Sequence, residues 1–150
     1  MNKMMLALTT ALLLMGATAA SAQSFGTAAE AKAMLEKAVA ELKAGEAPAI
    51  AKFNDKENKT FRDRDLYVFC YNGSDGKFTA HPNPALMGTD IRALKVGDDA
   101  LGQKIWDAAK EGAVATVAYN FPKPGTTNPV PKESFVTKVG GQGCGVGYYK

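Results

Sequence analysis

The stretch Leu66-Tyr67-Val68-Phe69-Cys70-Tyr71 decides the fold of this chain, together with the turn Asn72-Gly73-Ser74-Asp75-Gly76 and the returning segment Lys77-Phe78-Thr79-Ala80. The first six residues are aliphatic, aromatic or cysteine and carry no charge, which is typical of a buried strand. The Asn, Gly, Ser and Asp cluster predicts a tight turn, so the third segment is expected to pair back as the second strand of a hairpin.

Successive side chains of a strand point to opposite faces of its sheet. One face therefore holds Leu66, Val68 and Cys70, and the other holds Tyr67, Phe69 and Tyr71. The aliphatic face suits packing against a helix. The aromatic face suits the wall of a ligand cavity, because rings with hydroxyl groups supply both apolar walls and polar contacts. The alternative is that all six residues are ordinary core.

Two helices are expected upstream of this hairpin. Thr27-Ala28-Ala29-Glu30 is a capping box that begins the first, which runs to about Lys43 before Gly45. Its inner stripe is rich in alanine (Ala28, Ala31, Leu35, Ala38 and Leu42). The stripe is expected to pack on the protein's own sheet, and a homodimer through this N-terminal helix is the alternative. The second, shorter helix begins at Glu46-Ala47-Pro48.

The segment 54–65 between these helices and the hairpin is dense in charged residues. Such a run usually forms a solvated connector. The alternative is that Arg62 or Arg64 projects over a ligand pocket.

The remaining chain predicts one helix and three more strands. The helix is expected from Gly97-Asp98-Asp99 to about Glu111, followed by strands at 113–120, 132–139 and 144–149. Residues 121–131 contain four prolines and predict a stiff hairpin loop. The element order therefore indicates an α+β domain with a five-stranded antiparallel sheet.

The N-terminus has the pattern of a secretory signal peptide. Lys3 precedes an apolar run from Met4 to Met15, and Ala20-Ser21-Ala22 suits cleavage after Ala22. An N-terminal membrane anchor is the alternative, although the run is short for a membrane span. We expect a signal peptide at 1–22 and one periplasmic or secreted domain at 23–150, with a helical region at 23–58 and a sheet core at 65–150.

Composition excludes several classes of function. The formal charge is +3 and the lysines are scattered, so nucleic-acid binding is not indicated. His81 is the only histidine, so we expect no metal site, no cofactor and no catalytic set of residues. An enzyme is the least favoured class of function, and its best version would use His81 as a general base with Asp75. Cys70 and Cys144 both fall in expected strands of an exported chain, so they form either a disulfide or two buried thiols.

Several motifs together resemble the single-Cache family of extracytoplasmic, PAS-like sensor domains. They are Tyr67-Val68-Phe69, Ala80-His81-Pro82-Asn83-Pro84, the segment Val130-Pro131-Lys132-Glu133-Ser134-Phe135-Val136 after a proline-rich hairpin, and the closing Gly147-Tyr148-Tyr149. The resemblance covers about residues 53–150. It implies a long N-terminal helix on one face of an antiparallel sheet, a ligand pocket on the other face, and adjacent first and last strands. Cys70 and Cys144 would then lie on neighbouring strands, which favours the disulfide.

The resemblance also implies a function, which is recognition of a small molecule such as a short carboxylate or an amino-acid-like compound. It places Tyr67 and Phe69 in the pocket wall, His81 at the rim, Tyr119 on the facing strand and Lys132 as the cation for a carboxylate. Arg64 is a further candidate, which comes from the charged segment and not from the resemblance. A buried ammonium beside tyrosine hydroxyls is independently a good anion site. A surface lysine on an edge strand is the alternative for Lys132, and a structural histidine is the alternative for His81.

The chain also departs from the family pattern. Phe135 stands where the family often has tyrosine, so one hydroxyl group is expected to be missing. The family usually continues into a transmembrane helix and a signalling module, whereas this sequence ends at Lys150. We therefore expect a stand-alone ligand-binding protein that could present its ligand to a membrane receptor or kinase. The alternative is a ligand-free periplasmic subunit that docks a membrane signalling or transport protein.

Overall fold

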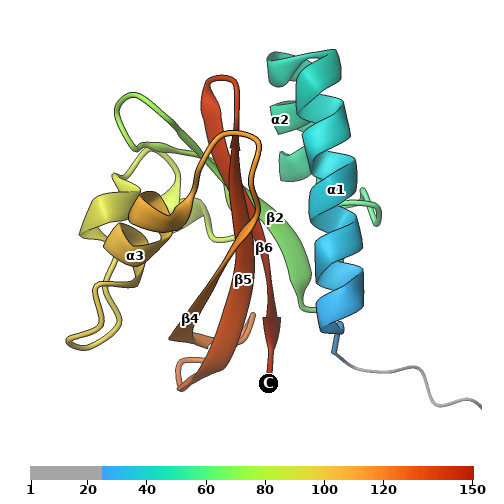
Figure 1. Cartoon of the computed structure of the whole chain (residues 1–150). Coiled ribbons are helices and arrows are strands. Elements are labelled where there is room, and N and C mark those ends of the chain that lie inside the picture. The colour runs from blue at the N-terminus through green and yellow to red at the C-terminus, as the bar shows by residue number, and fades with distance from the viewer. Residues whose placement is uncertain (1–24) are drawn as a thin grey trace, which may run out of the picture.

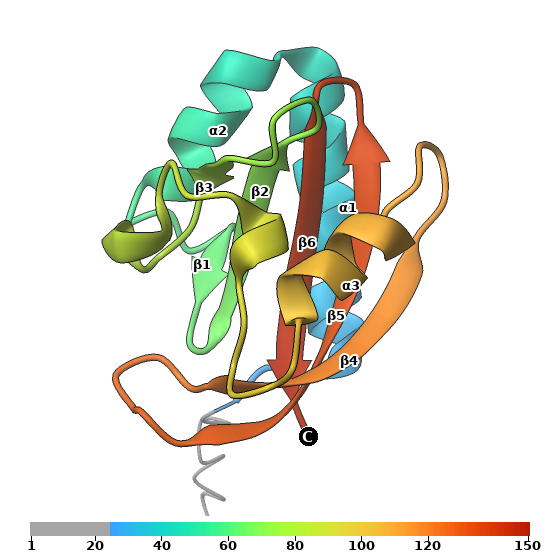
Figure 2. The ribbon, with the colours of Figure 1, turned by 90° about the vertical axis from the view of Figure 1, so that its left-hand side faces the viewer.

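The protein is described here by a computed structural model covering residues 25–150, so the expected signal peptide lies outside the described residues. A central antiparallel sheet separates two helical layers (Figures 1 and 2). Helices α1 (Ala28–Ala44) and α2 (Glu46–Asn54) cover one face, and α3 (Leu101–Ala108) lies on the other. The beginning of α1 and the end of the last strand lie at the same end of the molecule (Figure 1).

The strand order explains how distant parts of the chain meet. The strands are β1 (Arg62–Asp63), β2 (Leu66–Asn72), β3 (Phe78–Ala80), β4 (Ala115–Pro122), β5 (Pro129–Val139) and β6 (Gln142–Tyr149). Their order is β1-β2-β6-β5-β4, with β3 also paired to β2. The α+β fold and the five expected strands are confirmed, and so is the pairing of the first expected strand with the last. The two-residue β1 is an addition.

Helix α1 begins and packs as its sequence predicts. The Glu30 N–H donates to Thr27 Oγ1 at 3.2 Å, and the Thr27 N–H donates to Glu30 Oε2 at 2.7 Å. Ala31 and Ala38 are fully buried against the sheet, where their small side chains let the helix approach closely. The alanine stripe is thus covered within one chain, so a homodimer through α1, which stays a prediction, would use the helix's other faces.

The alternation along β2 sorts the core into two clusters, one on each face of the sheet. Leu66, Val68 and Cys70 belong to the cluster that contains α1 and α2. Tyr67, Phe69 and Tyr71 belong to the cluster that contains Leu101 and Ile105 of α3. The predicted division into a helix-packing face and an aromatic face is therefore confirmed.

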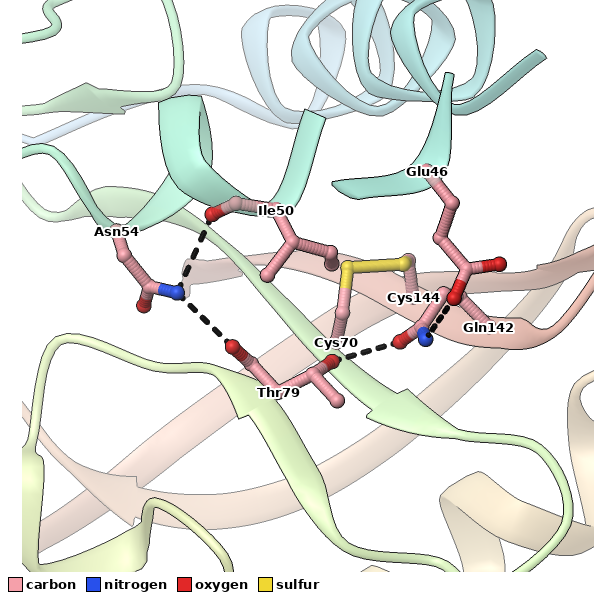
Figure 3. The surroundings of a disulfide bond; sticks show 7 residues. All are labelled: Glu46, Ile50, Asn54, Cys70, Thr79, Gln142 and Cys144. Carbon is pink, nitrogen blue, oxygen red and sulfur yellow. Dashed lines mark hydrogen bonds between the residues drawn. A yellow bond between two sulfur atoms is a disulfide. The ribbon is translucent and has the colours of Figure 1, made fainter. Parts of the chain in front are cut away.

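A disulfide joins β2 to β6 on the helix-packing face. Cys70 and Cys144 are register partners and are bonded, with an S–S distance of 2.08 Å. Figure 3 shows polar contacts around the bridge that attach α2 to the sheet. Asn54 Nδ2 donates to the Thr79 carbonyl at 2.9 Å, and Gln142 Nε2 donates to Glu46 Oε1 at 2.9 Å.

Some expected boundaries were wrong, among them the end of the third helix and the extent of the loop after β4. The third helix ends at Ala108, not near Glu111. The Lys110 carbonyl accepts the Lys138 N–H at 3.0 Å, so the segment after Ala108 bonds to β5 instead of continuing the helix. The loop between β4 and β5 is also shorter than expected, since Phe121 pairs with Val130 and Pro122 with Pro129. β5 pairs with β6 only from Lys132 onward, so β6 does not lie beside Pro129. The absence of an N–H on this proline therefore removes no hydrogen bond between β5 and β6.

Candidate functional site

A small cavity lies between the aromatic face of the sheet and the α3 layer. Its volume is about 20 Å³, which is room for about one water molecule. Strands β2, β3 and β4 and the segment from η2 (Ile91–Ala93) to α3 supply its walls. The lining residues are Tyr67, Phe69, Phe78, His81, Ile91, Leu94, Leu101, Ile105, Tyr119 and Phe121.

Lys132 of β5 places its amine against Tyr67, one of the residues of the cavity wall. Its Nζ donates to the Tyr67 hydroxyl at 2.8 Å and to the Tyr149 hydroxyl at 3.4 Å. The same nitrogen lies 4.3 Å from the Tyr67 ring centroid, 4.6 Å from that of Tyr149 and 5.3 Å from that of Phe121. The residue is only 2% exposed, and β5 lies between β6 and β4, so the edge-strand alternative is wrong.

The amine of Lys132 has no ion-pair partner among residues 25–150. Burial lowers its pKa to about 7, and the negative charge of Asp65 opposes this shift. Two of the three ammonium protons have partners in the structure, which leaves one available. A buried cation without a carboxylate is a site where an anionic ligand gains a charge-assisted hydrogen bond.

His81 is held with its ring edge among aromatic neighbours. Its Nδ1 accepts the Asn83 N–H at 2.9 Å, which puts the proton of the neutral ring on Nε2. Burial, and then the charge of Lys132, lowers the pKa of His81 to about 3. The ring is therefore neutral at physiological pH. Its centroid lies 5.3 Å from that of Tyr67 and 5.4 Å from that of Phe78, inside the cavity wall.

Glycines at alternate positions of β6 leave space on the aromatic face for side chains of the two neighbouring strands. A Cβ on Gly147 would lie 2.6 Å from Lys132 Cε and 2.4 Å from Ser134 Oγ. A Cβ on Gly145 would lie 2.5 Å from Phe69 Cζ. On this face the side chains of β2 and β5 therefore lie across the glycines of β6, and the side chain of Tyr149 follows at the end of the strand.

A larger hollow of about 330 Å³ adjoins the cavity and shares Tyr67, His81 and Phe121 with it. Its other walls come from β1, the segment after His81, and the β4–β5 loop. They are Arg62, Pro82, Asn83 and residues 122–126. The small inner cavity and this hollow together form a candidate binding site that reaches the surface beside β1.

Comparison with known proteins identifies the family. The family profile described as "Single Cache domain 2" matches residues 2–148. The chain belongs to the single Cache domain 2 family. Cache sensory domains are extracytoplasmic and bind ligands. Among the described residues, we find no helix with the length and hydropathy that a membrane span requires.

Solved structures of chemotaxis receptors share the Cache fold. A periplasmic sensor domain of a chemotaxis protein is 27% identical, with a TM-score of 0.59, over 79% of this chain and 86% of that chain. A methyl-accepting chemotaxis protein from Vibrio parahaemolyticus is 22% identical, with a TM-score of 0.64, over 81% and 86%, and indicates the fold alone. A Cache chemosensory domain described for carboxylic acid recognition is 25% identical, with a TM-score of 0.59, over 79% and 84%. Among curated protein sequences, none matches significantly.

The Cache domain brings together five of the six residues that the sequence marked as ligand-binding. Tyr67, Phe69, His81 and Tyr119 line the cavity, and the Lys132 amine lies over the Tyr67 ring. The Tyr119 hydroxyl is 2.6 Å from Ser134 Oγ, and burial raises its pKa to about 12, so it is a neutral hydrogen-bonding group.

Arg64 lies apart from the other five. It has a positive φ of 56° at the turn between β1 and β2. Its guanidinium donates to Glu30 Oε1 at 2.7 Å and to Asp63 Oδ2 at 2.8 Å, so it connects the turn to α1. Arg62, which the sequence offered as the alternative, lines the outer hollow instead.

Sequence reasoning missed Tyr149 and the apolar walls. Tyr149 belongs to the closing motif, and only the pairing of β5 with β6 places its hydroxyl near Lys132. The expectation that Phe135 removes a hydroxyl group from the pocket was wrong. Its ring stacks on Tyr148 at 5.9 Å and packs in the α1 cluster, on the other face of the sheet.

Proposed function

We propose that this Cache domain is an extracytoplasmic, sensory-type binding protein for a small carboxylate. The single observation behind this proposal is the Lys132 amine, which is buried against the cavity-wall residue Tyr67, bonded to two tyrosine hydroxyls and unpaired with any described carboxylate. A carboxylate at this position would meet a cation in a water-poor environment, where a charge-assisted hydrogen bond is strong.

The other residues have complementary roles in this proposal. The Tyr67 and Tyr149 hydroxyls accept hydrogen bonds from the amine and orient it. The His81 Nε2–H is an uncharged hydrogen-bond donor for the ligand at the rim of the cavity. Phe69 and Tyr119 form walls around the ligand's apolar part. Arg64 has no role here, because it is already engaged with Glu30 and Asp63.

Two comparisons support the class of ligand and the setting. The Cache domain described for carboxylic acid recognition is similar over 79% of this chain. The periplasmic sensor domain of a chemotaxis protein covers the same share. Export with cleavage after Ala22, and presentation of the ligand to a membrane receptor or kinase, are parts of the same proposal.

The size of the inner cavity favours one alternative. A cavity of about 20 Å³ admits about one water molecule, so a carboxylate must either sit in the adjoining 330 Å³ hollow or displace the walls. A domain with so small an inner cavity could instead act as a ligand-free subunit that docks a membrane signalling or transport protein.

Calorimetry with acetate, propionate and lactate tests both functions. We expect the wild-type protein to bind at least one of these anions, and Lys132→Ala to weaken binding by about 2–5 kcal/mol. Lys59→Ala is the matched control, because Lys59 is exposed in the connector before β1. Unchanged affinity in Lys132→Ala would remove Lys132 from the site. If the wild-type protein binds none of these anions and none raises its melting temperature, the docking function is favoured.

A further inference from the structure

The geometry points to a covalent mode of recognition, in which the Lys132 amine captures a 2-oxo acid as a reversible imine. This inference rests on the proposed function, because it places the ligand's carboxylate at the same amine. It adds a chemical class to the ligand, namely a carboxylate with an adjacent carbonyl group, and it adds a reaction to the site.

The surroundings of Lys132 are those of a nucleophilic amine. The rings of Tyr67, Phe121 and Tyr149 enclose the nitrogen at 4.3–5.3 Å, and none of the described carboxylates is paired with it. Lysines that form imines with carbonyl compounds are activated by desolvation of this kind. Burial lowers the pKa of Lys132 to about 7, so a substantial fraction of the amine is unprotonated at neutral pH.

The position of the amine suits an adjacent carbonyl group. In a 2-oxo acid the carbonyl carbon is bonded directly to the carboxylate carbon, so an amine within hydrogen-bond distance of the carboxylate also lies close to the carbonyl carbon. The His81 Nε2–H and the Tyr67 hydroxyl remain to hold the carboxylate once the amine has reacted, whereas the Tyr149 hydroxyl donates to the Pro122 carbonyl at 2.6 Å.

The reaction balances without an oxidant or a further reactant. The nitrogen lone pair forms a bond to the carbonyl carbon as the carbonyl π electrons move to oxygen. One N–H proton transfers to that oxygen and gives a carbinolamine. The C–O bond then breaks, the second N–H proton leaves with the hydroxyl group as water, and the C=N bond forms. The Tyr67 hydroxyl, which accepts a hydrogen bond from the amine at 2.8 Å, is placed to relay these protons.

Reductive trapping with pyruvate tests the inference, and propionate is the matched ligand that lacks the carbonyl group. The purified protein is incubated with pyruvate near pH 7.5, reduced with sodium cyanoborohydride, digested and mapped by mass spectrometry. We expect a reduced pyruvyl group on Lys132 well before the exposed lysines react. Excess propionate should protect Lys132 from labelling. In Lys132→Arg, which keeps the cation but not the nucleophile, the site-specific label should disappear while propionate still binds.

The outcomes separate this inference from the proposed function. If pyruvate and propionate bind equally in calorimetry and Lys132 is labelled no faster than the exposed lysines, the imine is overturned and the carboxylate site stands. If neither anion binds and no label accumulates on Lys132, both ideas fail. Labelling of Lys132 that propionate does not prevent would show a reactive amine outside a carboxylate site, which also overturns this proposal.

Discussion

The buried amine of Lys132 shows how neighbours set the behaviour of one residue. Removing an ammonium group from water costs several kcal/mol unless partners compensate for the lost hydration. Here the compensation comes from two hydroxyls and three aromatic faces, with no paired carboxylate among the described residues. The lowered pKa of Lys132 reports that this compensation is incomplete. A bound anion would supply the missing partner and restore the charge.

Binding of a carboxylate is therefore expected to take up a proton above pH 7. The free amine has a pKa of about 7, and the bound anion raises that pKa, so at pH 8 most sites must gain a proton on binding. Affinity should change only about twofold between pH 6 and 7 and fall about tenfold per pH unit above pH 8. Calorimetry at pH 8 in buffers of different ionisation enthalpy measures the proton uptake.

The groups facing Lys132 do not obscure this measurement. Burial holds the pKa of His81 near 3 and the pKa values of Tyr67 and Tyr149 above their usual range, and Asp65 is the charged neighbour. In Lys132→Arg, where the cation does not titrate, affinity should not depend on pH between 7 and 9. A wild-type protein that takes up no proton at pH 8 would contradict the prediction.

Among the elements, strand β6 determines how much room the site has. Its glycines leave space on the aromatic face for Tyr71, Phe69 and Lys132 from the strands on either side. Its other face carries Cys144 and Val146 into the α1 cluster. Strand β6 thus places side chains in the core on one face of the sheet, and on the other face its glycines leave space for side chains of β2 and β5.

Gly147→Ala is expected to impair the site more than its size suggests. The new Cβ would lie 2.4 Å from Ser134 Oγ and 2.6 Å from Lys132 Cε, so both side chains must move and the amine is displaced. We expect a loss of stability of about 1–3 kcal/mol and clearly weaker carboxylate binding. Urea unfolding and calorimetry measure the two effects. Gly45→Ala is the control, because its Cβ would meet only the Pro48 ring at 3.6 Å. Equal affinity in Gly147→Ala and the wild-type protein would refute this role of the glycine.

The elements that could be predicted are those whose own residues determine them. The capping box of α1 and the alternation of β2 are local patterns, and both gave the correct element and the correct buried face. The end of α3 could not be predicted, since a hydrogen bond between Lys110 and Lys138, distant in sequence, overrides local helix propensity. The same limit applies to the site. Lys132 could be inferred from its motif, whereas Tyr149 and the α3 walls join it only through the sheet topology.

In the whole molecule, the sheet separates the disulfide and the α1–α2 layer from the proposed binding site. The disulfide, α1 and α2 lie on one face, while the cavity and α3 lie on the other (Figures 1 and 2). Cys70 and Cys144 are 74 residues apart in sequence, so the bond removes a large amount of conformational freedom from the unfolded chain. Both cysteines belong to the α1 cluster and not to the aromatic cluster. This arrangement predicts that the bond contributes to folding and not to binding.

Replacing both cysteines with alanine tests this separation. The double variant should lose about 2–4 kcal/mol of unfolding free energy, mostly because its unfolded state is no longer cross-linked. Guanidinium unfolding with and without a reducing agent measures the loss, and the reductant should lower the stability of the wild-type protein alone. Below the lowered melting temperature, carboxylate affinity should match that of the wild-type protein. A folded variant with weakened binding would mean that β2 and β6 transmit the state of the disulfide through the sheet to Tyr67 and Lys132, and the two faces would then act as one unit.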